Sequence, residues 1–182
     1  MQLFGQFFAL LVWSTTAPAV FAQQVAAYGF EWSGGGGYGL RGGMAFDAAL
    51  VREGLVTHDD VTCFEIEGVK NGAVIGRWAL GMRGLETTWR LHFSPRASAF
   101  FVEGQLIGMP QAWNMDGYGE NCGAGGFGFN IGNYAQDICL DGALIVDSQV
   151  PPEQPFVAQR NDGYVFGADA CLGPMMLSGL RR

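Results

Sequence analysis

Two glutamates, Glu65 and Glu67, stand two residues apart in the run V-T-C-F-E-I-E-G-V of residues 61–69. The run alternates, which predicts a half-buried strand with Phe64 and Ile66 on one face and both glutamates on the other. Two carboxylates about 5–5.5 Å apart can act as acid and nucleophile on a glycosidic bond, and a wider pair as acid and base. Since neighbouring acidic residues on an exposed strand more often serve solubility, we favour a non-catalytic protein and keep a carbohydrate-active hydrolase using this pair as the alternative.

A second group of side chains could bind a cation. Asn114, Asp116 and Glu120 lie in residues 104–123, a stretch with little hydrophobic pattern that predicts a long ordered loop. Their oxygens are of the kind that Ca²⁺ prefers, and the glycines nearby allow tight bends. An ordinary loop rich in Asn and Asp has the same composition. We therefore expect no metal, with calcium bound by these three residues as the alternative.

The same stretch contains Trp113 and Tyr118. Aromatic rings placed in a loop can stack on a sugar or contact another protein, so these two residues are the ligand-binding candidates. The aromatic residues at alternating positions of predicted strands are expected in the core instead. They are Trp89, Phe93, Phe127 and Phe129.

The glycine-rich run from Ser33 to Gly43 contains the pattern G-x-G-x-x-G twice. A dinucleotide site needs a helix directly after the glycines, but the residues that follow are typical of a strand. Glycine also suits a tight turn, because positive φ costs it little. The sequence therefore predicts two paired antiparallel strands over residues 28–46 and no nucleotide cofactor.

The chain has four cysteines, Cys63, Cys122, Cys139 and Cys171. An even number in an exported chain predicts two disulfides, for which three pairings exist. Cys122 and Cys139 flank a predicted hairpin, so we favour that pair, which leaves Cys63 for Cys171. A zinc site is the weaker interpretation, because the chain has no C-x-x-C and both histidines are far from every cysteine in sequence.

The N-terminus and the charge indicate where the protein acts. Residues 1–22 carry no charged side chain and end in small residues before Gln23, which predicts a signal peptide and a secreted, periplasmic or extracellular protein. The chain has 17 acidic and 10 basic residues, a net charge of −7, and no basic stripe. We therefore expect no nucleic-acid partner and no transmembrane segment in the mature chain. A glycan or an envelope protein is the expected partner.

Short aromatic and β-branched runs separated by Gly, Pro, Asn and Asp predict the fold. We expect residues 23–182 to form one all-β domain, an antiparallel β-sandwich or jelly-roll-like fold with one or two short helices. Asp47 is a candidate cap for one of these helices. Asn71-Gly72 predicts a tight hairpin turn, and residues 156–160 and 164–168 predict a last hairpin.

A resemblance supports the same expectation. Its motifs span most of the mature chain: residues 30–38, 46–49, 54–56, 64–68 and 71–72, then Gln111-Ala112-Trp113-Asn114, residues 126–129 and Ala135-Gln136. In this order they resemble uncharacterised exported bacterial proteins of the group that carries a PEP-CTERM sorting tail. Here no transmembrane segment follows residues 150–155, so the resemblance implies export without that sorting tail. It implies an envelope or extracellular β-protein and assigns no activity to any residue.

Overall fold

The computed structural model describes residues 24–102 and 108–172. The predicted signal peptide, residues 1–22, lies outside them. Within the described ranges the protein is an antiparallel β-sandwich with a single main aromatic core. None of the helices described there is long and apolar enough to cross a lipid bilayer.

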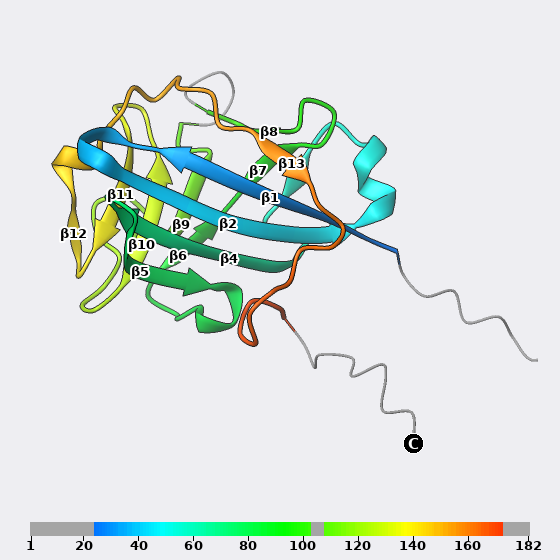
Figure 1. Ribbon diagram of the computed structural model, residues 1–182, viewed down its shortest axis with the longest axis horizontal. Coiled ribbons are helices and arrows are strands. Elements are labelled where there is room, and N and C mark those ends of the chain that lie inside the picture. Colours follow the sequence, from blue (N-terminus) through cyan, green and yellow to red (C-terminus); the bar gives the residue numbers. More distant parts are fainter. Residues whose placement is uncertain (1–23, 103–107, 173–182) are drawn as a thin grey trace, which may run out of the picture.

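The first sheet has the order β13-β1-β2-β4-β5, in which four long strands are joined by the short β13 (Figure 1). Their bounds are β1 Val25–Ser33, β2 Tyr38–Asp47, β4 Val61–Lys70, β5 Ala73–Ala79 and β13 Ala158–Arg160. All neighbours in it are antiparallel, and β13 pairs with β1 from the far end of the chain.

The second sheet has the order β12-β11-β10-β9-β6, and a small third sheet has the order β3-β7-β8. The bounds of the second sheet are β6 Thr88–Arg90, β9 Gln111–Met115, β10 Phe127–Ile131, β11 Gln136–Leu140 and β12 Ala143–Leu144. Those of the third are β3 Val56–Thr57, β7 His92–Ser94 and β8 Ala99–Phe100. Both lie behind the first sheet in Figure 1.

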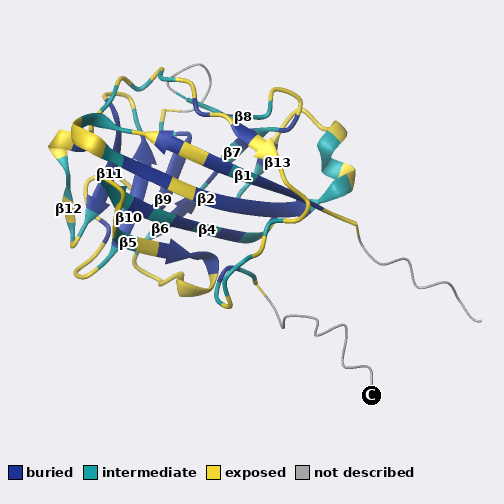
Figure 2. Ribbon diagram, in the orientation of Figure 1, coloured by how far each residue is buried: buried dark blue, intermediate teal, exposed yellow. Residues whose placement is uncertain are grey.

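The core between the sheets is unusually aromatic. Phe30 and Phe64 of the first sheet meet Trp113 of the second, with ring centroids 5.7 Å and 4.9 Å from it. The four aromatic residues expected inside, Trp89, Phe93, Phe127 and Phe129, are all buried. Figure 2 shows how much of the strands is buried, with exposed residues concentrated in the connections and at a few positions of the first sheet.

Both predicted turns are confirmed. The glycine run forms the hairpin tip between β1 and β2, where Gly35–Gly37 make a short 3-10 turn. Asn71 and Gly72 have φ of 49° and 84°, and they reverse the chain between β4 and β5. Neither site offers the strand–turn–helix geometry that a dinucleotide needs.

The helical content of the described residues is four short 3-10 segments. They span Gly35–Gly37, Ala48–Arg52, Leu80–Met82 and Val146–Ser148. The Asp47 side chain accepts a hydrogen bond from the amide of Ala49, 2.8 Å away, as expected for the cap of the second segment.

Two sequence-based predictions were wrong. Residues 111–115, assigned to a long loop, form strand β9, which lies between β10 and β6 in the second sheet. Residues 164–168, assigned to a last strand, form no strand; only Ala158–Arg160 of the predicted hairpin does, and it pairs with β1. The chain after β13, orange in Figure 1, crosses in front of the first sheet instead.

Candidate functional site

The outer face of the first sheet carries a charged row. Glu31, Arg41, Glu67 and Arg77 stand directly opposite one another on four adjacent strands. Arg41 donates to Glu67, and Arg77 donates to Asp169, 2.6 Å away. The signs alternate along the row, so these charges are compensated largely within the protein.

Residues 161–171, which we call the C-terminal strap, cover Glu65 on this face. The Tyr164 hydroxyl donates to one oxygen of Glu65 at 3.3 Å, and the amide of Gly167 donates to the other at 3.1 Å. The Tyr164 ring lies against Gly43, where a Cβ would stand only 2.4 Å from the ring. Burial, followed by the nearby Glu65 carboxylate, raises the pKa of Tyr164 to about 12.

The strap is fixed to β4 by the Cys63–Cys171 disulfide, which confirms the predicted pairing. The amide of Phe64 also donates to Ala170, and that of Leu172 to Thr62. A cavity of about 830 Å³ remains beside the strap, lined by Glu65 and Glu67 among others. The two glutamates of the hydrolase alternative therefore share one face and one cavity, but both of them already accept hydrogen bonds from protein groups.

The outer face of the second sheet carries a different row. Arg90, Ala112, Asn130 and Asp137 stand opposite one another on β6, β9, β10 and β11. Arg90 donates to the carbonyl of Met109 at 3.3 Å. Ala112 and Asn130, which stand between Arg90 and Asp137, are uncharged, so no cation of this row is next to Asp137.

Asp137 and Asn130 are both deeply buried, with 3% and 5% of their surface exposed. Asn130 donates to one oxygen of Asp137, and the side-chain amide of Gln149 donates to the other at 3.0 Å. Burial raises the pKa of Asp137, while these two hydrogen bonds act in the opposite direction. The carboxylate is thus held by two neutral amides.

Asp137, Asn130 and Gln149 line a cavity of about 520 Å³. Tyr118 and Tyr134, on two different loops, line it as well, and they are 87% and 95% exposed. We call this cavity the tyrosine pocket. Buried polar groups beside exposed aromatic rings are the usual makeup of a small-ligand site, because the rings supply contact area and the polar groups fix orientation.

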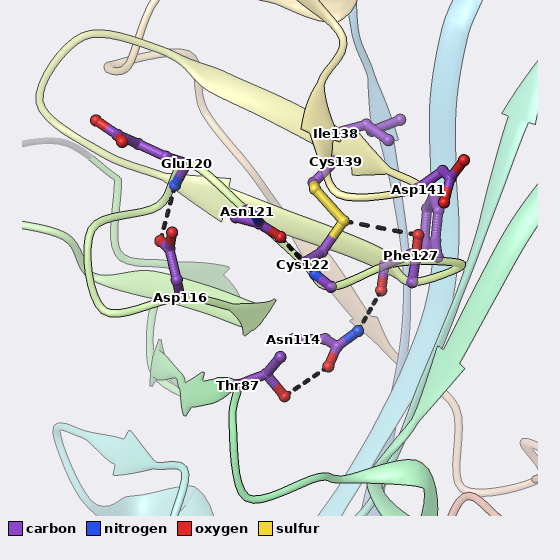
Figure 3. Close-up of a disulfide and its surroundings, with 12 residues drawn as sticks. Thr87, Asn114, Asp116, Glu120, Asn121, Cys122, Phe127, Ile138, Cys139 and Asp141 are labelled. Atoms are coloured by element: carbon purple, nitrogen blue, oxygen red, sulfur yellow. Dashed lines mark hydrogen bonds between the residues drawn. A yellow bond between two sulfur atoms is a disulfide. The ribbon is translucent and has the colours of Figure 1, made fainter.

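The loop that carries Tyr118, residues 116–126, is held over the second sheet by the Cys122–Cys139 disulfide (Figure 3). This pairing was also predicted. Cys139 lies two residues from Asp137 on β11, so both side chains project from the outer face. Asn130 reaches the same loop by donating to the carbonyl of Gly119 at 3.4 Å. The disulfide therefore joins one wall of the tyrosine pocket to its floor.

The three calcium candidates do not converge. Asn114 accepts from Thr87 at 2.7 Å and donates to the carbonyl of Phe127 at 2.9 Å. Asp116 accepts from two amides of its own loop, those of Tyr118 and Glu120. In Figure 3 the Glu120 carboxylate points away from Asp116. Within residues 24–102 and 108–172, no three His, Cys, Asp or Glu side chains form a group that could hold a metal ion.

The two aromatic candidates have opposite environments. Tyr118 is exposed at the tyrosine pocket, as a ligand-binding residue must be. Trp113 is fully buried in β9, and its indole donates to Gln111, so placing it on a binding surface was wrong. The prediction failed because of Gln111, which also faces the core. Its side-chain amide donates to the carbonyls of His92 and Phe101. A polar residue at an inward position hides the alternation of this strand.

Sequence reasoning missed Asn130, Asp137, Gln149 and Tyr134. A signal for the first two was present, since both occupy outward positions of strands β10 and β11, on either side of Gly132-Asn133, a pair of residues that favours a turn. Continuing that hairpin register places Asn130 opposite Asp137. No comparable signal existed for Gln149, which reaches Asp137 from beyond the last strand of the sheet.

Comparison with known proteins gives no further guide to the site. No protein-family model, curated protein or solved structure matches the chain.

Proposed function

We propose that this chain is an exported, non-catalytic binding module of the bacterial envelope or extracellular matrix that holds a carbohydrate in the tyrosine pocket. The observation that carries the proposal is the pairing of a buried Asp137–Asn130 floor with the exposed rings of Tyr118 and Tyr134. A sugar ring has apolar C–H faces and polar hydroxyl edges. Tyrosine rings suit the first, and buried carboxylate and amide groups suit the second.

Export is supported by two independent features. The pattern of residues 1–22 is typical of a signal peptide. All four cysteines are paired in disulfides, which persist in oxidising compartments. Expression in a bacterium with and without residues 1–22, followed by fractionation, tests this part: the full chain is expected in the periplasm or medium, shortened at its N-terminus.

The hydrolase alternative would use the cavity on the first sheet. The strap argues against this alternative, because Tyr164 and Gly167 donate hydrogen bonds to both oxygens of Glu65. Neither Trp32 nor Trp113 walls that cavity, since both are buried in the core. Release of reducing ends from polysaccharides, lost in Glu65→Gln and Glu67→Gln, would favour the hydrolase over the binding module.

The binding proposal is tested with the purified disulfide-bonded protein on a glycan array, with and without Ca²⁺. The affinities of the glycans that bind are then measured by calorimetry for the wild type and for the Tyr118→Ala and Tyr134→Ala variants. Each substitution is expected to weaken binding about 2- to 12-fold, the value of one aromatic contact. Leu85→Ala is the control, since Leu85 is fully exposed and does not line the pocket. Equal binding by all four proteins would remove the proposal.

A further inference from the structure

The charged side chains of the tyrosine pocket decide which sugars it can hold. Its charged lining residues are Arg90, Glu120 and Asp137. Of the two carboxylates, Glu120 is exposed and screened by solvent, whereas Asp137 is only 3% exposed. The charge of Asp137 is therefore the one that a bound ligand meets with little solvent between them.

Asp137 is equipped to accept further hydrogen bonds. A carboxylate has about four acceptor positions, and Asn130 and Gln149 occupy one on each oxygen. Both partners are amides, so they add no positive charge. The hydroxyl groups of an uncharged sugar are donors that fit the remaining positions, whereas a ligand carboxylate or sulfate would bring a second negative charge.

Arg90 does not cancel this charge. Its strand, β6, lies three strand spacings from β11, so the two backbones are about 14 Å apart with Ala112 and Asn130 between them. Its guanidinium donates to the Met109 carbonyl. Counted together, the lining has two carboxylates and one guanidinium, and the whole chain has a net charge of −7. Both local and long-range fields oppose an anionic ligand.

Resting on the proposed function, we infer that the tyrosine pocket selects uncharged carbohydrates and rejects acidic ones, with Asp137 as the residue that determines this specificity. Its carboxylate accepts from ligand hydroxyls next to the Asn130 amide. The tyrosine rings contribute affinity for either class, because stacking on a sugar face does not depend on charge.

The experiment compares matched oligosaccharides. The neutral probes are oligomers of glucose, mannose and galactose, and each is paired with its uronate, which has the same ring and linkage but a carboxylate at the sixth carbon. Wild-type protein is expected to bind at least one neutral oligomer more tightly than its uronate by at least about tenfold at moderate salt. Asp137→Asn should bring this ratio close to one, because the amide keeps the shape and removes the charge.

Glu120→Gln is the control variant, since it removes an exposed charge from the same lining and should change the ratio far less. Thermal melting establishes that each variant is folded, and the wild-type ratio decides the question even if Asp137→Asn does not fold. Uronates that bind as tightly as their neutral partners would overturn the specificity inference and leave the carbohydrate proposal standing. Failure of every oligomer to bind would overturn both.

Discussion

The two outer faces of the sandwich are built on the same plan and differ in how their charges are compensated. Each has a row of residues across four strands, a segment that crosses over it, and a disulfide that fixes that segment. On the first sheet, guanidinium groups of the row pair with carboxylates, and the strap closes over Glu65. On the second sheet, the hydrogen-bond partners of Asp137 among residues 24–102 and 108–172 are two side-chain amides, and it lies in a cavity with exposed tyrosines.

We interpret this difference as the one between a structural polar face and the proposed binding face. Opposite charges that already pair with each other on the protein surface need no further partner from a ligand. A buried carboxylate with free acceptor positions is stabilised by any donor that enters beside it. The cavity beside the strap, at about 830 Å³, is larger than the tyrosine pocket, at about 520 Å³. We still favour the tyrosine pocket as the binding site, because its carboxylate is not paired with a cation.

The largest expected effects come from removing the two disulfides. The Cys63–Cys171 bond closes a loop of 108 residues, and the Cys122–Cys139 bond closes one of 17. Loop-closure entropy predicts losses of about 5 and about 3 kcal/mol respectively in the free energy of unfolding. Urea unfolding of the two double Cys→Ser variants measures them.

The same pair of variants separates the two faces. At temperatures where both are folded, removal of Cys122–Cys139 should weaken carbohydrate binding, because it frees a wall of the tyrosine pocket. Removal of Cys63–Cys171 should leave binding unchanged. Equal loss of binding in both variants would contradict the separate roles of the faces.

A smaller effect is expected where Tyr164 lies on the first sheet. Gly43→Ala places a Cβ about 2.4 Å from the Tyr164 ring, so the ring must move away from Glu65. We expect a loss of about 1–3 kcal/mol in the free energy of unfolding. Gly29→Ala is the matched control, since its Cβ would be 3.6 Å from the same ring, an ordinary contact. A control as destabilising as Gly43→Ala would show that the sheet, not the strap, is affected.

The smallest effect is in the pH dependence of stability, where the faces should have opposite signs. The hydrogen bond from Arg77 lowers the pKa of Asp169 below its ordinary value of 3.8, so its contribution is present above that value and is lost as pH falls through the lowered pKa. Burial raises the pKa of Asp137 above 3.8, so its contribution decreases as pH rises from 3.8 through the raised pKa.

Urea unfolding from about pH 3 to pH 7 of wild type, Asp169→Asn and Asp137→Asn tests these signs. As pH rises, the free energy of unfolding of the wild type should increase relative to that of Asp169→Asn. The increase should be less than about 1 kcal/mol, because that ion pair is partly exposed. Over the same range the free energy of unfolding of the wild type should decrease relative to that of Asp137→Asn. Parallel curves for the two variants would show that the two carboxylates are in equivalent environments.

Much of the fold could be predicted from the sequence because local chemistry determines it. The alternation around Phe64 and Ile66, the Asn71-Gly72 turn and the even number of cysteines each have a direct physical meaning. The inward Gln111 and the strap could not be predicted in the same way. Both depend on backbone groups from distant parts of the chain, namely the carbonyls of His92 and Phe101 for Gln111 and the β4 backbone for the strap.

The candidate site was predicted only in part for the same reason. Tyr118 was identified from its place in a loop, but its proposed role depends on Asp137, which lies on strand β11 in another part of the chain. The hydrogen bond from Gln149 to Asp137 spans 12 residues and follows no strand register. A site assembled from four loops and four strands has little signature in any single segment of the sequence.

The most direct test of the central claim is a two-dimensional NMR titration of ¹⁵N-labelled protein with the tightest-binding neutral oligosaccharide. The side-chain amides of Asn130 and Gln149 report on the tyrosine pocket, and those of Gln159 and Asn161 report on the cavity of the first sheet. We predict that the first pair shifts in a saturable way while the second pair stays in place. Saturable shifts at Gln159 and Asn161 with none at Asn130 and Gln149 would contradict the account.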